Sequence, residues 1–375
     1  MQVCKIAAST VLAILALIVA EIASAQSVPQ PPQRLCLDSV ACPTAMKWNP
    51  GHYMQHRSFD QAARFSDYDA GDFASNRNIQ GVSVFFRWNQ LEGNTRGDYA
   101  AGIKLIQAEI RKLKSLPVPK RLIIRVMDRL YDDTPSLGEY ARIYPQYMYD
   151  AGKLFTGPST VLWKRYDAEA NGWFIDMLNA YAAAFEGEPF VEMICPFQET
   201  SYDSSTAPSD FSSSKLRTQY DRLALALRTA WPTTNVWMPT NWEPYSSMGS
   251  FLSYLASIDV GAGNPDTVKS GTQLADTYLR GEVGGTDYRG VMPIVFAIED
   301  TSMGYRSGEW NVTAQEAFQY VNGTAWANYF LWDRNTWVGT DDQRWYKAGT
   351  TQPGGILQVI NSQPLTHLSK PIGYP

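Results

Sequence analysis

The segment Phe174–Ser201, FIDMLNAYAAAFEGEPFVEMICPFQETS, contains a helical pattern, a turn and a strand pattern in direct succession. Its first half repeats apolar residues every three or four positions, as on one face of a helix: Phe174, Met177, Leu178, Tyr181, Ala182 and Phe185. Its second half is the apolar run Phe190–Phe197, which polar residues flank on both sides, as expected of a buried strand. A helix that leads directly into a buried strand predicts βαβ units and a parallel sheet.

The same alternation extends in both directions along the chain. The helical spacing recurs at Ile103, Ile106, Ile110 and Leu113, and again at Leu216, Tyr220, Leu223, Leu227 and Ala230. Short apolar or β-branched runs predict eight strands: Ala45–Trp48, Gly81–Phe86, Arg121–Met127, Phe190–Phe197, Asn235–Met238, Ser257–Gly261, Val291–Ile298 and Asn328–Trp332. Eight such units predict an α/β fold, a single-domain (β/α)8 TIM barrel with long βα loops.

A doubly wound open sheet is the alternative architecture. It would normally place a glycine-rich phosphate-binding turn after its first strand. Here the predicted first strand is followed by Asn49-Pro50-Gly51-His52. Gly261-x-Gly263 is half of a dinucleotide fingerprint, but Asp266 stands where the third glycine belongs, so we interpret it as a loop. The barrel is therefore favoured.

The first residues have the three parts of a secretory signal. Lys5 precedes the apolar run Ile6–Ala20, which ends near Ala23-Ser24-Ala25. Glu21 interrupts the run too early for a membrane anchor. We therefore predict a signal peptide at 1–25, an extended segment at 26–44 and the barrel at 45–375, in a secreted or periplasmic protein that has no membrane contact after cleavage.

Cysteine usage is consistent with export. Cys36 and Cys42 lie close together in the extended segment, which predicts a local disulfide; two free thiols are the alternative. Cys195 lies inside an apolar run, where a cysteine is usually an inert buried residue.

Composition and motifs exclude several functions. The chain has 32 basic and 37 acidic residues and a net charge of -5, which disfavours nucleic-acid binding. It has three histidines and no HExxH, GxSxG, Walker A or CxxC pattern. We therefore predict neither a metal ion nor a cofactor.

Two predicted strands end in a glutamate. Glu199 follows the fourth predicted strand and Glu299 follows the seventh, at the barrel end where active sites form. Two such carboxyl groups across one barrel mouth are what glycosidic-bond cleavage needs. Each alone is more commonly a capping or surface residue, and Glu243 after the fifth strand competes with Glu199 as the acid. Glu192 lies near a strand start, at the end where residues serve stability.

Aromatic side chains supply a second signal for carbohydrate, because sugar rings stack on flat aromatic faces. Five tryptophans fall at or just beyond predicted strand ends: Trp48, Trp88, Trp242, Trp332 and Trp337. Trp332, which Asp333-Arg334-Asn335 follows, is the preferred sugar-stacking residue. Arg87 and Arg125, late in the second and third strands, are expected to bond a catalytic carboxylate or a substrate hydroxyl, or to form buried ion pairs.

The order of these residues resembles a known group. A glutamate ending the fourth strand, another ending the seventh and a tryptophan ending the eighth resemble the clan of retaining (β/α)8 glycoside hydrolases that contains β-galactosidases, cellulases and mannanases. The segment Phe86–Glu92, with Gly97-Asp98-Tyr99 after it, is similar to the W-x-x-L-E…G-x-Y stretch of the β-galactosidase-like members. The resemblance implies that Glu199 is the acid/base and Glu299 the nucleophile. The clan usually has asparagine before the acid/base, to bond the sugar 2-hydroxyl, and Gln198 stands there in this chain.

Two functions remain open at this point. The first is a secreted retaining glycoside hydrolase that acts on an oligo- or polysaccharide without a cofactor. Its Glu199 would be kept protonated by an apolar neighbour or by the charge of Glu299. The second is a catalytically inactive barrel that binds glycan, because fold does not imply activity. Convergence of Glu199 and Glu299 in one site distinguishes the two functions.

Overall fold

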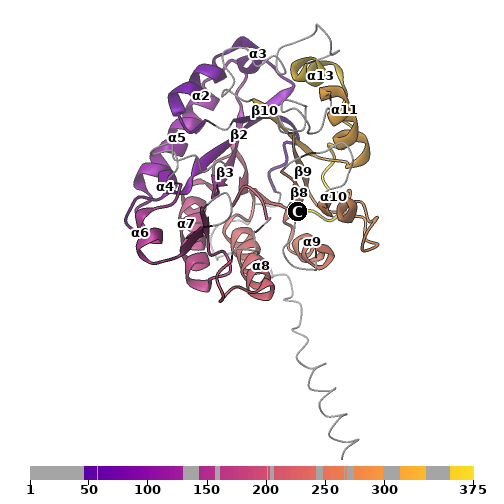
Figure 1. Ribbon diagram of the computed structural model, residues 1–375. Coiled ribbons are helices and arrows are strands. Elements are labelled where there is room, and N and C mark those ends of the chain that lie inside the picture. Colours follow the sequence, from indigo (N-terminus) through magenta and orange to yellow (C-terminus); the bar gives the residue numbers. More distant parts are fainter. Residues whose placement is uncertain are drawn as a thin grey trace, which may run out of the picture. The chain divides into compact units, whose positions relative to one another are not determined.

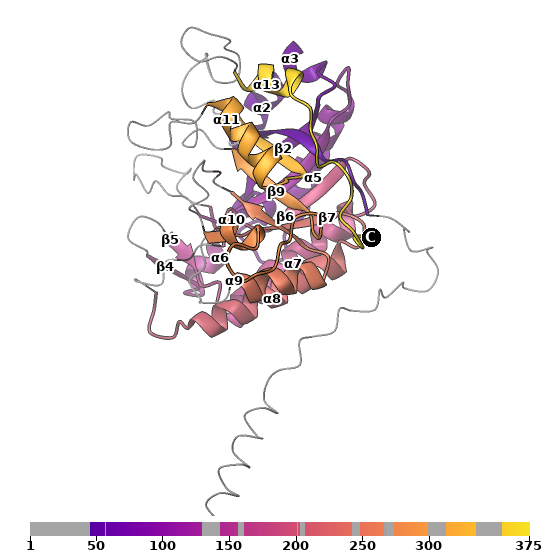
Figure 2. The same ribbon diagram turned by 90° about the vertical axis from the view of Figure 1, so that its right-hand side faces the viewer.

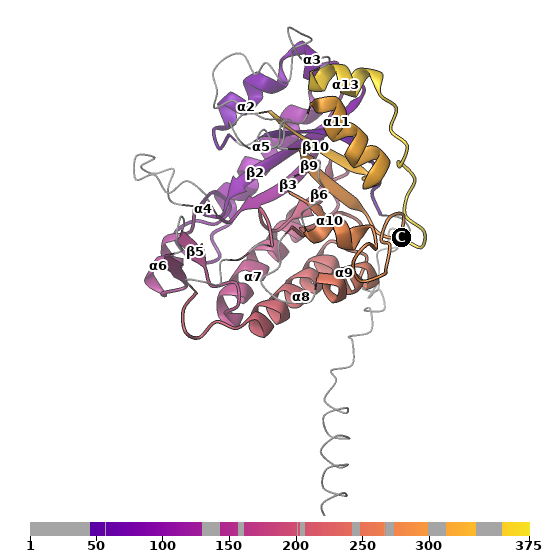
Figure 3. The ribbon, with the colours of Figure 1, turned by 45° about the vertical axis from the view of Figure 1, so that its right-hand side comes forward.

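A computed structural model describes residues 46–56, 58–129, 143–156, 161–200, 202, 207–241, 248–265, 267, 274–298, 313–334 and 355–375. Within these residues, eight parallel strands close into a barrel, and helices pack around its outside (Figures 1, 2 and 3). The order around the barrel is β1-β10-β9-β8-β7-β6-β3-β2. The predicted (β/α)8 barrel is therefore confirmed, and the open sheet is excluded.

The barrel strands are β1 (Gly51–His56), β2 (Ile79–Arg87), β3 (Arg121–Met127), β6 (Val191–Cys195), β7 (Asn235–Pro239), β8 (Gly261–Asn264), β9 (Ile294–Ile298) and β10 (Tyr329–Arg334). The α-helices are α2 (Gln61–Tyr68), α3 (Gly71–Ala74), α4 (Trp88–Leu91), α5 (Ala100–Lys114), α6 (Gln146–Asp150), α7 (Ala168–Phe185), α8 (Ser213–Ala230), α9 (Met248–Ser257), α10 (Leu274–Leu279), α11 (Ala314–Gln319) and α13 (Ile356–Ser362). A π-helix, η3 (Tyr320–Thr324), follows α11. The three predicted apolar stripes lie on α5, α7 and α8, which bury all of them except the partly buried Ile103 and Ala230.

A hairpin that the sequence did not predict interrupts the connection from β3 to α7. Its strands, β4 (Leu154–Thr156) and β5 (Val161–Trp163), pair antiparallel, and the hairpin lies beside α6 (Figures 2 and 3). Trp163 at its end is fully buried. The hairpin leads directly to Arg165.

The core has two layers, because successive side chains of a barrel strand point alternately inward and outward. One cluster fills the inside of the barrel: Tyr53, Ile123, Met193, Cys195, Trp237, Val295, Ala297, Tyr329 and Leu331. The larger cluster lies between the strands and the helices. Burial raises the pKa of the Cys195 thiol to about 11, as expected of an inert buried cysteine.

The first strand lies further along the chain than predicted. Residues 46–48 form no strand, and β1 begins at Gly51. Three polar residues of β1 conceal its strand pattern, yet all three are buried and bonded: His56 Nε2 lies 2.7 Å from Asp67 Oδ2, Gln55 accepts from Arg125, and His52 accepts from Trp332. Their partners are distant in sequence, so the run appears too polar for a buried strand.

The sixth barrel strand is also displaced from its prediction. Ser257 ends α9, and β8 comprises the glycine-rich residues that were interpreted as a loop. An added Cβ would lie 1.8 Å from Val295 O at Gly263 and 2.9 Å from Pro293 O at Gly261. Gly263 also has a φ of +152°, which other residues rarely adopt. These glycines therefore permit close approach of β9.

Glu192 closes the barrel at the amino ends of the strands, as predicted for a residue near a strand start. Its carboxylate accepts hydrogen bonds from Asn49 N (2.8 Å), Asn49 Nδ2 (2.8 Å), Tyr329 OH (2.7 Å) and Asn235 Nδ2 (3.1 Å). Burial raises the pKa of Glu192. Tyr374 OH, 2.8 Å from Asn235 Oδ1, extends this cluster.

Other predictions concern residues that the structure does not describe. The signal peptide at 1–25 and the segment 26–44, with Cys36 and Cys42, lie outside the described residues. Within the described ranges, no helix is both long and apolar enough to span a bilayer. The same ranges contain no group of three histidine, cysteine or acidic side chains placed to hold a metal ion.

Candidate active site

Glu199 lies four residues beyond the end of the fourth barrel strand, β6. The strand count made from the sequence is therefore correct, although the first strand was misplaced. Glu299 directly follows β9, the seventh barrel strand, but is itself outside the described residues, as are Trp242 and Glu243. Of the glutamates predicted for the site, Glu199 is the one whose side chain the structure describes.

The Glu199 side chain is buried, with 3% of the residue exposed, and is held from two sides. Oε1 accepts a hydrogen bond from Arg129 Nη1 at 2.9 Å, and Oε2 accepts one from Asn241 Nδ2. Arg129 follows β3 and Asn241 follows β7, the two strands that flank β6 in the barrel. The carboxyl ends of three adjacent strands thus meet at this carboxylate, which fixes its orientation.

Arg129 places a positive charge in contact with the Glu199 carboxylate. A guanidinium in contact with a carboxylate stabilises the ionised form. The sequence analysis expected an apolar neighbour or a second carboxylate, either of which would keep the acid protonated. Among the described contacts is instead one with a cation, because Arg129 lies two residues beyond the end of β3.

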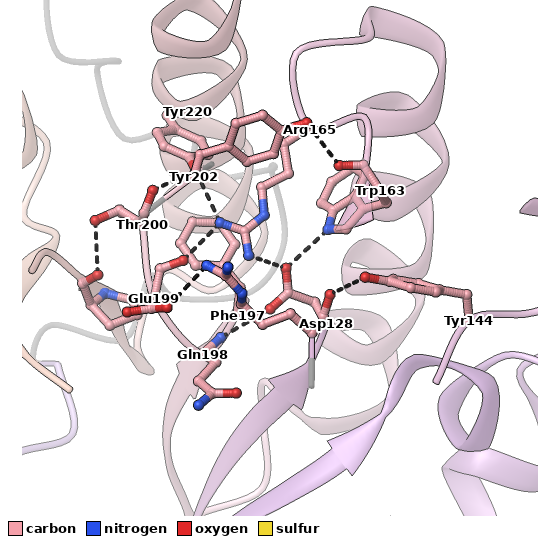
Figure 4. A network of polar contacts seen from close by, with 12 residues as sticks. Asp128, Tyr144, Trp163, Arg165, Phe197, Gln198, Glu199, Thr200, Tyr202 and Tyr220 are labelled. Carbon is pink, nitrogen blue, oxygen red and sulfur yellow. Dashed lines mark hydrogen bonds and ion pairs between the residues drawn. The ribbon is translucent and has the colours of Figure 1, made fainter. Parts of the chain in front are cut away.

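Gln198 and Arg125 contribute to the same end of the barrel. The backbone N–H of Gln198 donates to Asp128 Oδ1 at 3.1 Å, and its carbonyl accepts from Arg125 Nη2 at 3.3 Å. The side-chain amide of Gln198 points away from this network in Figure 4. Arg125 also donates to Gln55 Oε1, and its guanidinium carbon lies 4.0 Å from the Phe85 ring centroid. Arg125 therefore lies beside the Glu199 segment, where a backbone carbonyl and an amide oxygen are among its partners.

Trp332 lies elsewhere than predicted. Leu331 belongs to the cluster inside the barrel, whereas Trp332 belongs to the cluster outside it and is fully buried. Its Nε1 donates to His52 Nδ1 at 3.0 Å. Trp332 thus points away from the barrel interior, so its described position is a core position and not that of a sugar-stacking residue.

Trp88 and Arg87 make their described contacts with residues other than Glu199. Trp88 begins α4, is fully buried, and packs on Trp163 with ring centroids 5.2 Å apart. Its Nε1 donates to Glu92 Oε2 at 3.0 Å. The guanidinium of the half-buried Arg87 lies over the Phe59 ring at 5.0 Å. The W-x-x-L-E stretch is therefore a structural motif in this chain, and Trp88 has no face exposed for a sugar.

Sequence reasoning missed both polar partners of Glu199. Arg129 lies at an apolar-to-polar transition after a strand, the same signal that identified Glu199, but the arginines predicted for the site were Arg87 and Arg125, which lie within their strands. Asn241 lies directly before Trp242 and Glu243, and the sequence analysis named Glu243, as a possible acid, and not Asn241. Arg129 and Asn241 both follow the end of a strand, so a change of polarity at a strand end predicts both when all polar residue types are included.

Comparison with known proteins supports the fold. No protein-family model and no curated protein matches this sequence. Solved structures do match: the catalytic domain of a β-amylase from Paenibacillus polymyxa has a TM-score of 0.54 and 8% identity over 77% of this chain and 92% of that one. A β-glucanase from Saccharophagus degradans in complex with cellotetraose has a TM-score of 0.52 and 11% identity over 84% of this chain and 88% of that one. The chain therefore shares its barrel fold with glycoside hydrolases.

Proposed function

We propose that this protein is a retaining glycoside hydrolase that acts on an oligo- or polysaccharide, with Glu199 as acid/base and Glu299 as nucleophile. The observation that carries the proposal is the placement of Glu199. Its carboxylate is buried at the carboxyl end of the fourth barrel strand and bonded from both neighbouring strands. Catalytic groups need such a fixed orientation, because small displacements reduce the rate strongly.

The second carboxyl group is proposed from the position of Glu299 after the seventh strand. Val295 and Ala297 of β9 point into the barrel, and residue 299 is the next position with the same parity. In a retaining enzyme the Glu299 carboxylate would attack the anomeric carbon while Glu199 protonates the leaving oxygen. Glu199 would then remove a proton from the water that releases the sugar from Glu299. We expect the two carboxyl groups to lie about 5–5.5 Å apart.

Arg129 affects the two steps differently. Ionised Glu199 is the form needed when Glu199 acts as the base in the second step, and the Arg129 guanidinium is compatible with that form. In the first step Glu199 has to carry a proton, so the nearby negative charge of Glu299 has to offset the guanidinium. Formation of the glycosyl ester removes that negative charge, and Arg129 then favours loss of the proton from Glu199.

Kinetics with aryl glycosides test the proposal. Glu199→Ala should retain kcat/KM for substrates whose leaving group needs no proton, and added azide should raise its kcat. Glu299→Ala should abolish turnover of every substrate, because no other group attacks the anomeric carbon. Proton NMR of the first product should show a retained anomer. An inverted product, or full activity of Glu299→Ala, would contradict the assignment.

A second candidate is a barrel that binds glycan without cleaving it. The contact between Glu199 and Arg129 favours this candidate, because a resting general acid needs a proton. Gln198, which stands in the place of the clan's asparagine, favours it as well. Titration calorimetry with oligosaccharides would then show binding by a wild-type protein that has no turnover.

We also propose that the protein is exported, on the evidence of the sequence pattern at 1–25. Exported material should begin near Gln26 by N-terminal sequencing and contain a Cys36–Cys42 disulfide by peptide mass mapping. An intact Met1 in exported material would contradict the signal peptide.

A further inference from the structure

A buried ion pair lies behind Glu199. Asp128, directly after β3, and Arg165, between β5 and α7, form a salt bridge in which the two side chains are 0% and 1% exposed. Asp128 Oδ2 also accepts from Trp163 Nε1 at 2.9 Å, and the Asp128 carbonyl accepts from Tyr144 OH at 2.6 Å. Figure 4 shows the pair between the hairpin side of the barrel and the segment that carries Glu199.

The pair bonds the backbone of that segment at consecutive residues. Asp128 Oδ1 accepts from the Gln198 N–H at 3.1 Å, and Arg165 Nη1 donates to the Glu199 carbonyl at 2.7 Å. Arg165 Nη1 also lies 3.0 Å from Tyr220 OH, which donates to the Thr200 carbonyl at 2.8 Å (Figure 4). The pair thereby bonds the peptide group that follows the Glu199 Cα and the one that precedes the Gln198 Cα, and Arg125 bonds the Gln198 carbonyl between them.

Stability alone does not explain the buried pair of Asp128 and Arg165. Removing two charges from water is costly, and well-packed apolar residues often replace a buried pair without loss of stability. The segment 198–200 has left the sheet, however, so its backbone groups need other partners when buried. Arg165 supplies a planar fork of donors that an apolar residue or a lysine cannot reproduce.

We infer that Asp128 and Arg165 are positioning residues that set the orientation of the Glu199 side chain through its own backbone. The inference rests on the proposed role of Glu199 as acid/base. Neither residue is assigned contact with substrate, and both act through the segment 198–200. A second buried pair in the same fold, Arg64–Glu109, has the same side-chain exposures, 1% and 0%, but joins α2 to α5. It provides a matched control.

The experiment compares Arg165→Lys with Arg64→Lys, two substitutions that keep the charge and remove the fork. Aryl glycosides with a poor and a good leaving group separate proton donation from the other steps. For Arg165→Lys, kcat/KM should fall about 100-fold with the poor leaving group, the scale of a displaced catalytic group, and less than about 3-fold with the good one. Arg64→Lys should change neither value when compared at a similar loss of thermal stability.

Hydrogen exchange provides a readout that does not depend on activity. Arg165→Lys should increase exchange of the amides of residues 198–200, and Arg64→Lys should leave them protected. An equal fall in kcat/KM for both leaving groups, or unchanged exchange at 198–200, would overturn the inference. If the wild-type protein cleaves no glycoside, the proposed function has failed, and the exchange result still decides whether the pair orders the Glu199 segment.

Discussion

Glu192 and Glu199 are two buried glutamates of the same β/α unit, one near each end of β6. Glu192, at the amino end, is bonded by amide, hydroxyl and backbone donors that carry no charge. Glu199, beyond the carboxyl end, is bonded by the amide of Asn241 and by the guanidinium of Arg129. The partners, and not the depth of burial, distinguish the two residues.

The difference shows what each end of the barrel requires. Neutral donors satisfy the carboxyl group of Glu192 in a closed cluster, where burial raises its pKa. A charged partner beside Glu199 couples that carboxylate to any other charge that enters the site. Function in such barrels is found at the carboxyl ends of the strands, and the opposite end serves stability.

The largest expected effect separates the two glutamates by activity. Glu199→Gln keeps the shape of the side chain but can neither donate nor accept the catalytic proton. Its kcat/KM for substrates with poor leaving groups should fall about 10²- to 10⁴-fold. Glu192→Gln should stay within about 3-fold of wild type, since remote surface or structural changes rarely alter the site. Steady-state kinetics measure both, and a comparable loss in the two variants would remove the distinction.

The second effect separates them by stability. Glu192→Ala removes the shared acceptor of Asn49, Asn235 and Tyr329 and leaves their donors buried without it. The free energy of unfolding should fall by about 4 kcal/mol, since each buried donor left unsatisfied costs about 1–3 kcal/mol. Urea unfolding followed by tryptophan fluorescence measures the loss. A loss below about 1 kcal/mol would show that the closed cluster does not stabilise the barrel.

The sequence predicted most of the barrel because its helices and strands are amphipathic or apolar in a regular way. The stripes of α5, α7 and α8 and six of the eight strands lie where periodicity placed them. β1 was missed because the partners that satisfy its polar residues are remote in the chain. β8 was missed because close packing against β9 requires glycine, which in a sequence indicates a loop.

The candidate site was predictable only where polarity changes at a strand end. Glu199 stood out for that reason, whereas the prediction about Trp332 depended on which side chains of its strand point into the barrel. Tyr329, Phe330, Leu331 and Trp332 are all apolar, so alternation does not reveal which of them point into the barrel. Arg165 gave no signal at all, because it lies in a connection whose hairpin was not predicted.

A third buried carboxyl group tests whether location or partners decide behaviour. Asp276 lies at the carboxyl end of the barrel, where its Oδ1 accepts from Asn264 Nδ2 at 3.1 Å, and Asn264 is the last residue of β8. Its Oδ2 accepts from Tyr320 OH at 2.8 Å. These direct partners are neutral, as at Glu192. If partners decide, Asp276 should act as a structural acid despite its location.

The smallest expected effect follows from the pKa of this acid. Burial raises the pKa of Asp276 to about 6 from 3.8, against weaker opposing effects of Tyr320, Asn264 and Arg280. The folded protein then binds the proton more tightly than the unfolded chain does. The stabilisation is complete below about pH 3.8 and is lost as the pH rises through about 6.

A shift of about two pKa units corresponds to about 3 kcal/mol. Asp276→Asn should remove this pH dependence, so the difference in unfolding free energy between variant and wild type should change by about 3 kcal/mol between pH 4 and pH 7. Urea unfolding at both pH values measures it. A difference that does not vary with pH would show that folding leaves the pKa of Asp276 unchanged, and that location near the barrel mouth outweighs neutral partners.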